Sequence, residues 1–272
     1  MDKVRAIMSL TLSPRRYGQF NWIGLATLYR KEVRRFWTVG TQTILAPMVT
    51  TLLFLAIFVL ALGRDAGTLG GVPYMEFLAP GLIMMAMTQN AFANTSSSLL
   101  IAKVQGNIVD LLMPPLSPLE LTLGVALGGL TRGLVVGLAT AAAIWVFVPL
   151  NAVHPLFLVF HAVAASLMLA QIGVLAGILC DKFDHMAAVT NFVVTPLAFL
   201  SGTFYSTERL PEFGQILAHL NPFFYMIDGF RYGMIGHADG SLILGIIILS
   251  LVNLLLLAIN YRAFQQGWRL KA

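Results

Sequence analysis

Residues Thr43 to Leu62 read TILAPMVTTLLFLAIFVLAL, a run of 20 residues without a charged side chain. The hydrocarbon core of a bilayer is about 30 Å thick, and an α-helix needs about 20 apolar residues to cross it. The run therefore predicts a membrane-spanning helix. Of the 272 residues in the chain, 58% are hydrophobic and 11% are charged, whereas soluble domains carry about 25% charge. This composition excludes an ordinary water-soluble enzyme and indicates an all-α polytopic membrane protein.

Five further windows of similar length follow along the chain. One of them contains a charged side chain, Arg132, and another contains Pro196, at which we expect a kink. The windows are Phe77–Ala102, Leu121–Val148, Leu156–Cys180, Met186 to about Tyr205, and Ser241–Asn260. We therefore expect six transmembrane helices, which together form a membrane domain over residues 43–260.

A shorter charge-free stretch, Phe213 to Ile227, precedes the last window. Its 15 residues are too few to cross the membrane, and Asn221-Pro222 breaks the stretch in the middle. We expect a re-entrant or interfacial pair of short helices within residues 207–233, on the extracellular side. The residues assigned to this segment are Asn221, Pro222, Phe223 and Tyr225.

Lys and Arg residues divide unevenly between the two sides of the predicted membrane domain. Thirteen fall in residues 1–42, in the loop 103–120, in the loop after Cys180 and in the tail 261–272. The alternate side holds three, namely Arg64, Arg209 and Arg231. Basic loops resist translocation, so both termini are expected in the cytoplasm. Because the basic residues adjoin membrane segments, the net charge of +5 does not indicate a nucleic-acid partner.

Residues Gln19 to Thr38 have the periodicity of an amphipathic helix that precedes the first span. The apolar stripe consists of Trp22, Leu25, Tyr29, Val33 and Phe36, and the basic residues of the segment are Arg30, Lys31, Arg34 and Arg35. Such a helix is expected along the inner membrane surface. It serves either as a topology anchor alone or also as a contact for a cytoplasmic partner.

The loop 103–120 contains a short predicted helix, Ile108 to Met113, which Pro114 and Pro115 stop. Its apolar side chains are Ile108, Leu111, Leu112 and Met113. A loop in water has little reason to display such side chains unless something covers them. The cover is either the chain's own helix ends or another protein. We favour a docking helix for another protein.

The second window, Phe77 to Ala102, carries polar residues at helical spacing, namely Asn90, Asn94 and Ser97. Unpaired polar groups are costly in lipid, so this polar face is expected to point into the protein. Two interpretations remain open. The face either forms hydrogen bonds between helices or lines a path for a substrate.

Arg132 lies about one helical turn inside the predicted inner boundary of the third window. At that depth its side chain is expected to reach the cytoplasmic headgroups or to pack between helices. Three pairs or runs of glycine at four-residue spacing are expected to allow close helix packing. They are Gly124/Gly128, Gly129/Gly133/Gly137 and Gly173/Gly177.

The sequence offers no recognisable catalytic or metal-binding motif. The only cysteine, Cys180, cannot form an intramolecular disulfide, and no Gly-Lys pair exists from which a phosphate-binding loop could be built. We therefore expect a non-catalytic chain with no cofactor of its own. If ATP drives the protein, another polypeptide must hydrolyse it.

Several segments together resemble the permease subunit of ABC transporters of the ABC-2 type. These are YRKEVRRFW (29–37), YMEFLAPGLIMM (74–85), NIVDLLMPPLSP (107–118), TPLAFLSGTFYS (195–206), LNPFFYM (220–226) and GFRYGMIG (229–236). The resemblance covers nearly the whole chain and is closest to bacterial inner-membrane permeases of the multidrug and lipo-oligosaccharide export branch.

This resemblance implies a multi-pass inner-membrane efflux protein that forms a homodimer. Two copies of a separate cytoplasmic ATPase would bind ATP and Mg²⁺ and drive an amphiphilic or hydrophobic substrate outward. The residues implied for docking that ATPase, in a coupling helix, are Gly106, Asn107, Ile108, Asp110, Leu111 and Leu112. The alternative is a self-sufficient secondary transporter or channel, although the acidic residues expected on the outer side lie outside the predicted spans.

Overall fold

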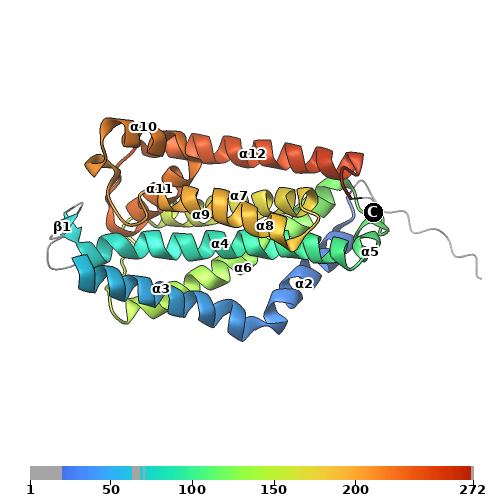
Figure 1. Cartoon of the computed structure of the whole chain (residues 1–272), viewed down its shortest axis with the longest axis horizontal. Coiled ribbons are helices and arrows are strands. Elements are labelled where there is room, and N and C mark those ends of the chain that lie inside the picture. Colours follow the sequence, from blue (N-terminus) through green and yellow to red (C-terminus); the bar gives the residue numbers. More distant parts are fainter. Residues whose placement is uncertain (1–19, 63–67, 70, 271–272) are drawn as a thin grey trace, which may run out of the picture.

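The computed structural model describes residues 20–62, 68–69 and 71–270, and most of them are helical (Figure 1). The first half contains α2 Trp22–Thr38, α3 Gly40–Leu62, β1 Thr68–Leu69, β2 Val72–Pro73, α4 Tyr74–Val104, α5 Ile108–Leu112 and α6 Pro118–Trp145. The second half contains α7 Pro155–Leu179, α8 Phe183–Val189, η1 Thr190–Val194, α9 Thr195–Phe199, η2 Thr207–Arg209, α10 Glu212–Leu220, α11 Pro222–Ile235 and α12 Leu242–Gln266. Expectations that concern Gln19, Arg64 and the ends of the chain fall outside these residues.

Within the described ranges, four helices are long and apolar enough to cross a membrane, namely α3, α6, α7 and α12. The window predicted at Phe77 to Ala102 lies within α4, which has 31 residues. At about 1.5 Å per residue that helix exceeds the thickness of a bilayer core, but its polar face makes it less apolar than the other four.

The fifth predicted window, Met186 to about Tyr205, is corrected in extent, because its helical run ends at Phe199; the run is irregular just before Pro196, where we expected a kink. The chain enters α8 at Phe183, passes through the π-helical turn η1 and ends α9 at Phe199. Pro196 explains the irregularity, because it has no N–H to donate and its ring crowds the carbonyl four residues earlier. The wider turn lets the Thr195 N–H bond to the Thr190 carbonyl instead.

The core is built around α4, which is buried along most of its length between α6 and α7. Glycines allow this close packing, as the sequence predicted. A methyl group on Gly129 of α6 would lie 2.6 Å from Thr95 Cγ2, and one on Gly177 of α7 would lie 2.7 Å from Leu99 Cβ. Any side chain at these positions would push the helices apart.

Hydrogen bonds join several helix ends at one end of the bundle, which we call the basic end. Lys103 Nζ, at the end of α4, donates to Cys180 O after α7 over 2.8 Å. Arg269 Nη1, after α12, donates to Leu179 O over 3.0 Å. The Asn21 N–H, before α2, donates to the Glu120 carboxylate at the start of α6. Both ends of the described chain therefore lie at the basic end, where Figure 1 marks the C-terminus.

The opposite end of the bundle contains α10 and α11, which meet at the predicted break, Asn221-Pro222. The Asn221 side chain accepts from the Phe223 N–H over 3.0 Å and so caps α11. Phe223 and Tyr225 are buried, because α11 packs against α4, α7 and α12. In contrast, α10 buries only Ala218 and lies on the outside of the fold.

Candidate functional site

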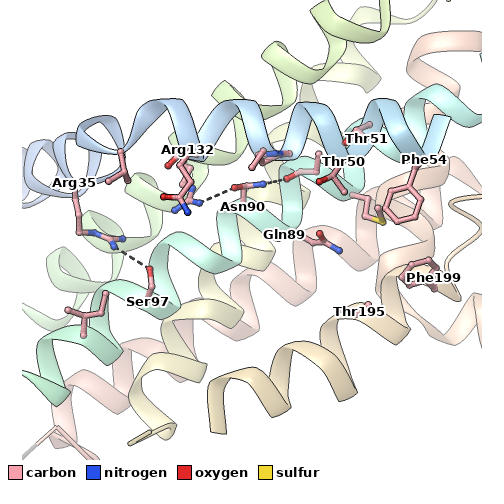
Figure 2. Close-up of a pocket in the computed structure, with 18 residues that line it drawn as sticks. Arg35, Thr50, Thr51, Phe54, Gln89, Asn90, Ser97, Arg132, Thr195 and Phe199 are labelled. Carbon is pink, nitrogen blue, oxygen red and sulfur yellow. Dashed lines mark hydrogen bonds between the residues drawn. The ribbon is translucent and has the colours of Figure 1, made fainter. Parts of the chain in front are cut away.

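A pocket of about 890 Å³ opens between α2, α3, α4, α6 and α9 (Figure 2). We call it the arginine pocket, because Arg35 and Arg132 both line it. Its other polar lining residues are Gln42, Thr43, Thr50, Thr51, Gln89, Asn90, Ser97 and Thr195. Two residues of the predicted polar face, Asn90 and Ser97, therefore lie in its wall.

The polar face of α4 holds the two arginines. Asn90 Oδ1 accepts from Arg132 Nη2 over 3.0 Å. Arg35 Nη2 donates to Asn94 Oδ1 over 3.0 Å, and Arg35 Nη1 donates to Ser97 Oγ over 3.2 Å. The structure therefore shows hydrogen bonds between helices along this face, and a path for a substrate stays a prediction. Asn94 is fully buried and bonds between helices, whereas Asn90 and Ser97 also face the pocket.

The amphipathic helix is present as α2, but its apolar face packs inside the protein on α6. Leu25, Leu28 and Phe36 are buried, and a methyl group on Gly124 of α6 would lie 2.6 Å from Leu28 Cδ2. Of the predicted stripe, Leu25 and Phe36 are buried in the protein, Val33 is half-buried, and Trp22 is 70% exposed. Tyr29 is half-buried, and its hydroxyl lies 2.9 Å from Thr131 Oγ1. The exposed basic residues of this helix are Arg30, Lys31 and Arg34.

Arg35 differs from these three, because it turns toward the bundle and pairs with Glu32. Its Nε lies 3.4 Å from Glu32 Oε2, and Ser98 Oγ donates to Glu32 Oε1 over 2.8 Å. Glu32 is completely buried and was not singled out from the sequence. The sequence could have indicated this burial, because Glu32 lies four residues from both Leu28 and Phe36 and hence on the same helical face.

Of the two expectations for Arg132, packing between helices agrees with the structure, because its guanidinium on α6 bonds to Asn90 on α4. Its side chain points into the arginine pocket, where Asn90 accepts its hydrogen bond (Figure 2). The cause is the neighbouring glycines on α6, which bring α4 so close that the Asn90 amide lies within reach. The Arg132 Nε is buried and has no hydrogen-bond partner among the described residues.

The predicted coupling helix is α5, and its apolar side chains lie on two faces, of which one is buried and the other is exposed. Ile108 and Leu111 are buried in a cluster with Leu28, Leu121 and Phe264, so for these two residues the cover is the chain's own helix ends and not the other protein that we favoured. Residues three apart lie on one face of a helix, and that face packs on the chain's own helix ends. Leu112 is half-buried, and the exposed residues are Gly106, Asn107, Val109, Asp110 and Met113.

A second group of polar residues, which we call the outer polar cluster, lies at the opposite end. It contains Asp228, Arg231, His237 and Asp239. Arg231 is almost fully buried, donates from Nη2 to Gly202 O over 2.6 Å and stacks its guanidinium 4.0 Å from the Phe77 ring centroid. The sequence had placed both aspartates outside the spans without foreseeing their burial.

Asp239 joins two loops within this cluster. Its Oδ2 accepts from Ser206 Oγ over 2.9 Å and from the Thr207 N–H over 2.7 Å, and its Oδ1 lies 2.8 Å from His237 Nε2. Burial alone would raise the pKa of Asp239, but the hydrogen bonds and the charge of Arg231 outweigh it and lower the pKa below 3.8. The loop before α10 is thereby fixed to the loop before α12.

Comparisons with known proteins agree with this arrangement. The family described as ABC-2 type transporter matches residues 24–235. The inner membrane transport permease YadH of Escherichia coli K12 is 38% identical over 253 residues, which cover 92% of this chain and 98% of that protein. Nodulation protein J of Neorhizobium galegae is 26% identical over 243 residues, which cover 86% of this chain and 90% of that protein. The chain therefore belongs to the ABC-2 type transporter family and is a multi-pass transport permease of the inner membrane.

Proposed function

We propose that this chain is the membrane subunit of an ATP-driven exporter. A separate cytoplasmic ATPase binds ATP and Mg²⁺, and two copies of this chain form the path for an amphiphilic or hydrophobic substrate. The observation that carries the proposal is the exposed apolar surface at the basic end, described below. Membership of the ABC-2 type family supports the ATPase partnership.

The proposed orientation places the basic end in the cytoplasm. Six passages of the chain along the bundle connect the two ends, made by α3, α4, α6, α7, the α8–α9 segment and α12. The hydrogen bonds at the basic end support this path, because they join the end of α4 to the end of α7 and to the residues after α12. The excess of Lys and Arg on that side supports the assignment to the cytoplasm.

The proposed ATPase contact, which we call the docking surface, combines α5 with the start of α2. Val109, Met113 and Ile23 expose 54%, 78% and 71% of their area, respectively. Asp110 and Leu111 of α5 and Ile23 of α2 border a groove of about 290 Å³ between the two helices. Exposed apolar side chains around a groove are typical of a surface that another protein covers.

The proposed second copy of the chain packs on the α8–α9 segment. No residue of α8 is buried, and Asn191 in η1 is exposed amid apolar neighbours. A side-chain amide that faces lipid would have no hydrogen-bond partner, whereas an amide that lies between two protein copies can bond to the other copy. This contact would place the arginine pocket, which Thr195 and Phe199 also line, next to the interface.

A secondary transporter driven by an ion gradient is the alternative, and it needs buried carboxylates that can titrate. The described residues include three buried carboxylates, Glu32, Glu120 and Asp228. Glu32 is paired with Arg35, Glu120 accepts from the Asn21 and Ser117 N–H groups, and the two oxygens of Asp228 accept from the Asp239 and Gly240 N–H groups over 2.7 and 3.0 Å. All three carboxylates are therefore occupied by structural contacts, which favours the ATP-driven exporter.

The proposal is tested by co-expressing this chain with the ATPase encoded beside its gene. Val109→Asp and Met113→Asp should abolish co-purification of the ATPase and leave the melting temperature of the permease unchanged. The matched control is Val153→Asp, because Val153 is exposed at the opposite end. Full retention of the ATPase by both docking variants would disprove the docking surface. Substrate movement by vesicles that hold only this chain would disprove the ATP-driven function.

A further inference from the structure

We propose that the arginine pocket binds the acidic headgroup of an amphiphile, with Arg132 as the counter-charge. The ligand class is a phosphate or carboxylate group attached to an apolar chain. This inference deepens the proposed function and rests on it only for the claim that the bound amphiphile is cargo. The binding site itself is argued from the charges, hydrogen bonds and shape of the pocket.

The two arginines differ in how far the protein neutralises them. Arg35 pairs with Glu32 at 3.4 Å and donates to Asn94 and Ser97, so both its charge and its donors are satisfied. Arg132 donates one hydrogen bond, to the neutral side chain of Asn90. None of the ion pairs within the described residues includes Arg132.

The pocket therefore carries one uncompensated positive charge inside the protein. None of its 18 lining residues is acidic. An isolated charge away from water is costly, and an ion of opposite charge offsets that cost. The Arg132 Nε, which is buried without a partner among the described residues, marks a hydrogen bond that such an ion would supply.

The wall beside Arg132 offers further groups for an anion. Gln42 and Thr50 of α3 and Gln89 of α4 line the same pocket and carry amide or hydroxyl donors. A guanidinium binds phosphate or carboxylate through parallel N–H groups, and neutral donors complete the shell of acceptor oxygens. An acidic group seated here would be held by charge and by hydrogen bonds together.

The far part of the pocket is lined by two phenylalanines, Phe54 and Phe199, among threonines, and carries no charged side chain, which favours an amphiphile over a free anion. Figure 2 shows Arg35 and Ser97 at one end, Arg132 and Asn90 in the middle, and Phe54 with Phe199 at the other end. Along α3, the lining runs from Gln42 to Phe54, a length of about 18 Å. An apolar chain attached to the acidic group would lie toward the two phenylalanines.

The test measures ligand-induced shifts in melting temperature for the full chain, alone, in phosphatidylcholine nanodiscs. The probes are dodecyl phosphate, dodecylphosphocholine with the same chain but no net charge, and inorganic phosphate. We expect a saturable rise in melting temperature with dodecyl phosphate and none with the other two, because a ligand that binds only the folded state stabilises it.

Two variants test the positive charge of Arg132, one by removing it and the other by neutralising it. Arg132→Gln keeps a donor for Asn90, and Gln89→Glu adds a carboxylate to the pocket while Arg132 stays in place. Both should weaken dodecyl phosphate binding by about tenfold or more. Arg132→Lys should retain part of the affinity. The control is Arg262→Gln, because Arg262 lies on the exposed face of α12 and should not matter.

A second nanodisc composition identifies the source of the headgroup. If phosphatidylglycerol in the disc competes with dodecyl phosphate, the site takes a lipid of the bilayer. If binding is undiminished, the site takes a single-chain cargo, and either result supports an acidic amphiphile. Equal binding of dodecylphosphocholine or inorganic phosphate, or unchanged binding by Arg132→Gln and Gln89→Glu, would overturn the inference. No ATPase is present, so loss of the docking surface would not alter these outcomes.

Discussion

Arg35 at the end of α2 donates a hydrogen bond to Asn94 Oδ1 of α4 over 3.0 Å, although the two residues are 59 positions apart. The start of the same helix lies beside α5, where Asn21 Nδ2 donates to Pro115 O over 3.1 Å. One helix therefore connects the residues around α5 with the wall of the arginine pocket. We expect a movement imposed on α5 by an ATPase to reach the pocket through α2.

The Glu32–Arg35 pair should show strong energetic coupling. Arg35→Gln leaves the buried Glu32 carboxylate without its counter-charge, which should cost about 3 kcal/mol of unfolding free energy. Glu32→Gln together with Arg35→Gln should cost much less than the sum of the single changes, because no charge is then left unpaired. Thermal denaturation of the four proteins in one detergent measures this. Additive losses would show that the pair is not coupled.

Close packing of α6 on α4 should make Gly129 intolerant of a side chain. A methyl group there would lie 2.6 Å from Thr95 Cγ2 and 2.9 Å from Ala91 O. Gly129→Ala should destabilise the fold by about 1–3 kcal/mol, as overpacking does. Gly40→Ala is the matched control, since no atom of the residues that the structure describes lies within 4 Å of the added methyl group. Equal melting temperatures for the two variants would contradict the packing shown here.

Lys103 should stabilise the end of α7. Its ammonium donates to Ile178 O over 2.9 Å and to Cys180 O over 2.8 Å, and it meets the Asp181 carboxylate at 2.6 Å. A cation at a helix C-terminus satisfies free carbonyls, so Lys103→Gln should cost about 1–2 kcal/mol. Lys182→Gln, at an exposed position, should be neutral. Melting temperatures at low salt distinguish them, and identical values would refute the role.

Asp239 predicts how stability depends on pH. Its pKa is lower in the folded protein than in the unfolded chain, so its contribution is present above pH 3.8 and is lost as the pH falls through the folded value. Asp239→Asn should lower stability by about 1–3 kcal/mol near neutral pH, because the charged acceptor of Ser206 and Thr207 is gone. The unfolding free energy of the variant should also fall less steeply as the pH is lowered through the acidic range. If calorimetry found the same dependence of stability on acidic pH in the variant and the original protein, this prediction would be contradicted.

The proposed orientation predicts a labelling pattern on a Cys180→Ser background. Met113→Cys should react with a membrane-impermeant maleimide in inverted vesicles and not in intact cells. Glu208→Cys should show the reverse, because Glu208 is exposed at the opposite end. Labelling of both positions from the same side would exclude a bundle that crosses the membrane with its basic end inside.

Local sequence determined where the chain forms helices. Windows of apolar residues located α3, α6, α7 and α12, because the cost of burying backbone in lipid makes any such run helical. Asn221-Pro222 marked the boundary between α10 and α11 for an equally local reason, since proline cannot continue a helix. The glycine spacing predicted which helix faces pack closely, but it did not predict which helix each glycine contacts.

Tertiary structure alone decided what each face contacts. Periodicity shows that Ile108 and Leu111 share a face, yet only the arrangement of the helix ends shows that the chain itself covers them. The inward turn of Arg35, the burial of Glu32 and the pairing of Arg132 with Asn90 depend on partners from 42 to 66 positions away. Side-chain direction at these sites is set by which acceptor lies opposite. That acceptor comes from another helix, so no single segment contains the information.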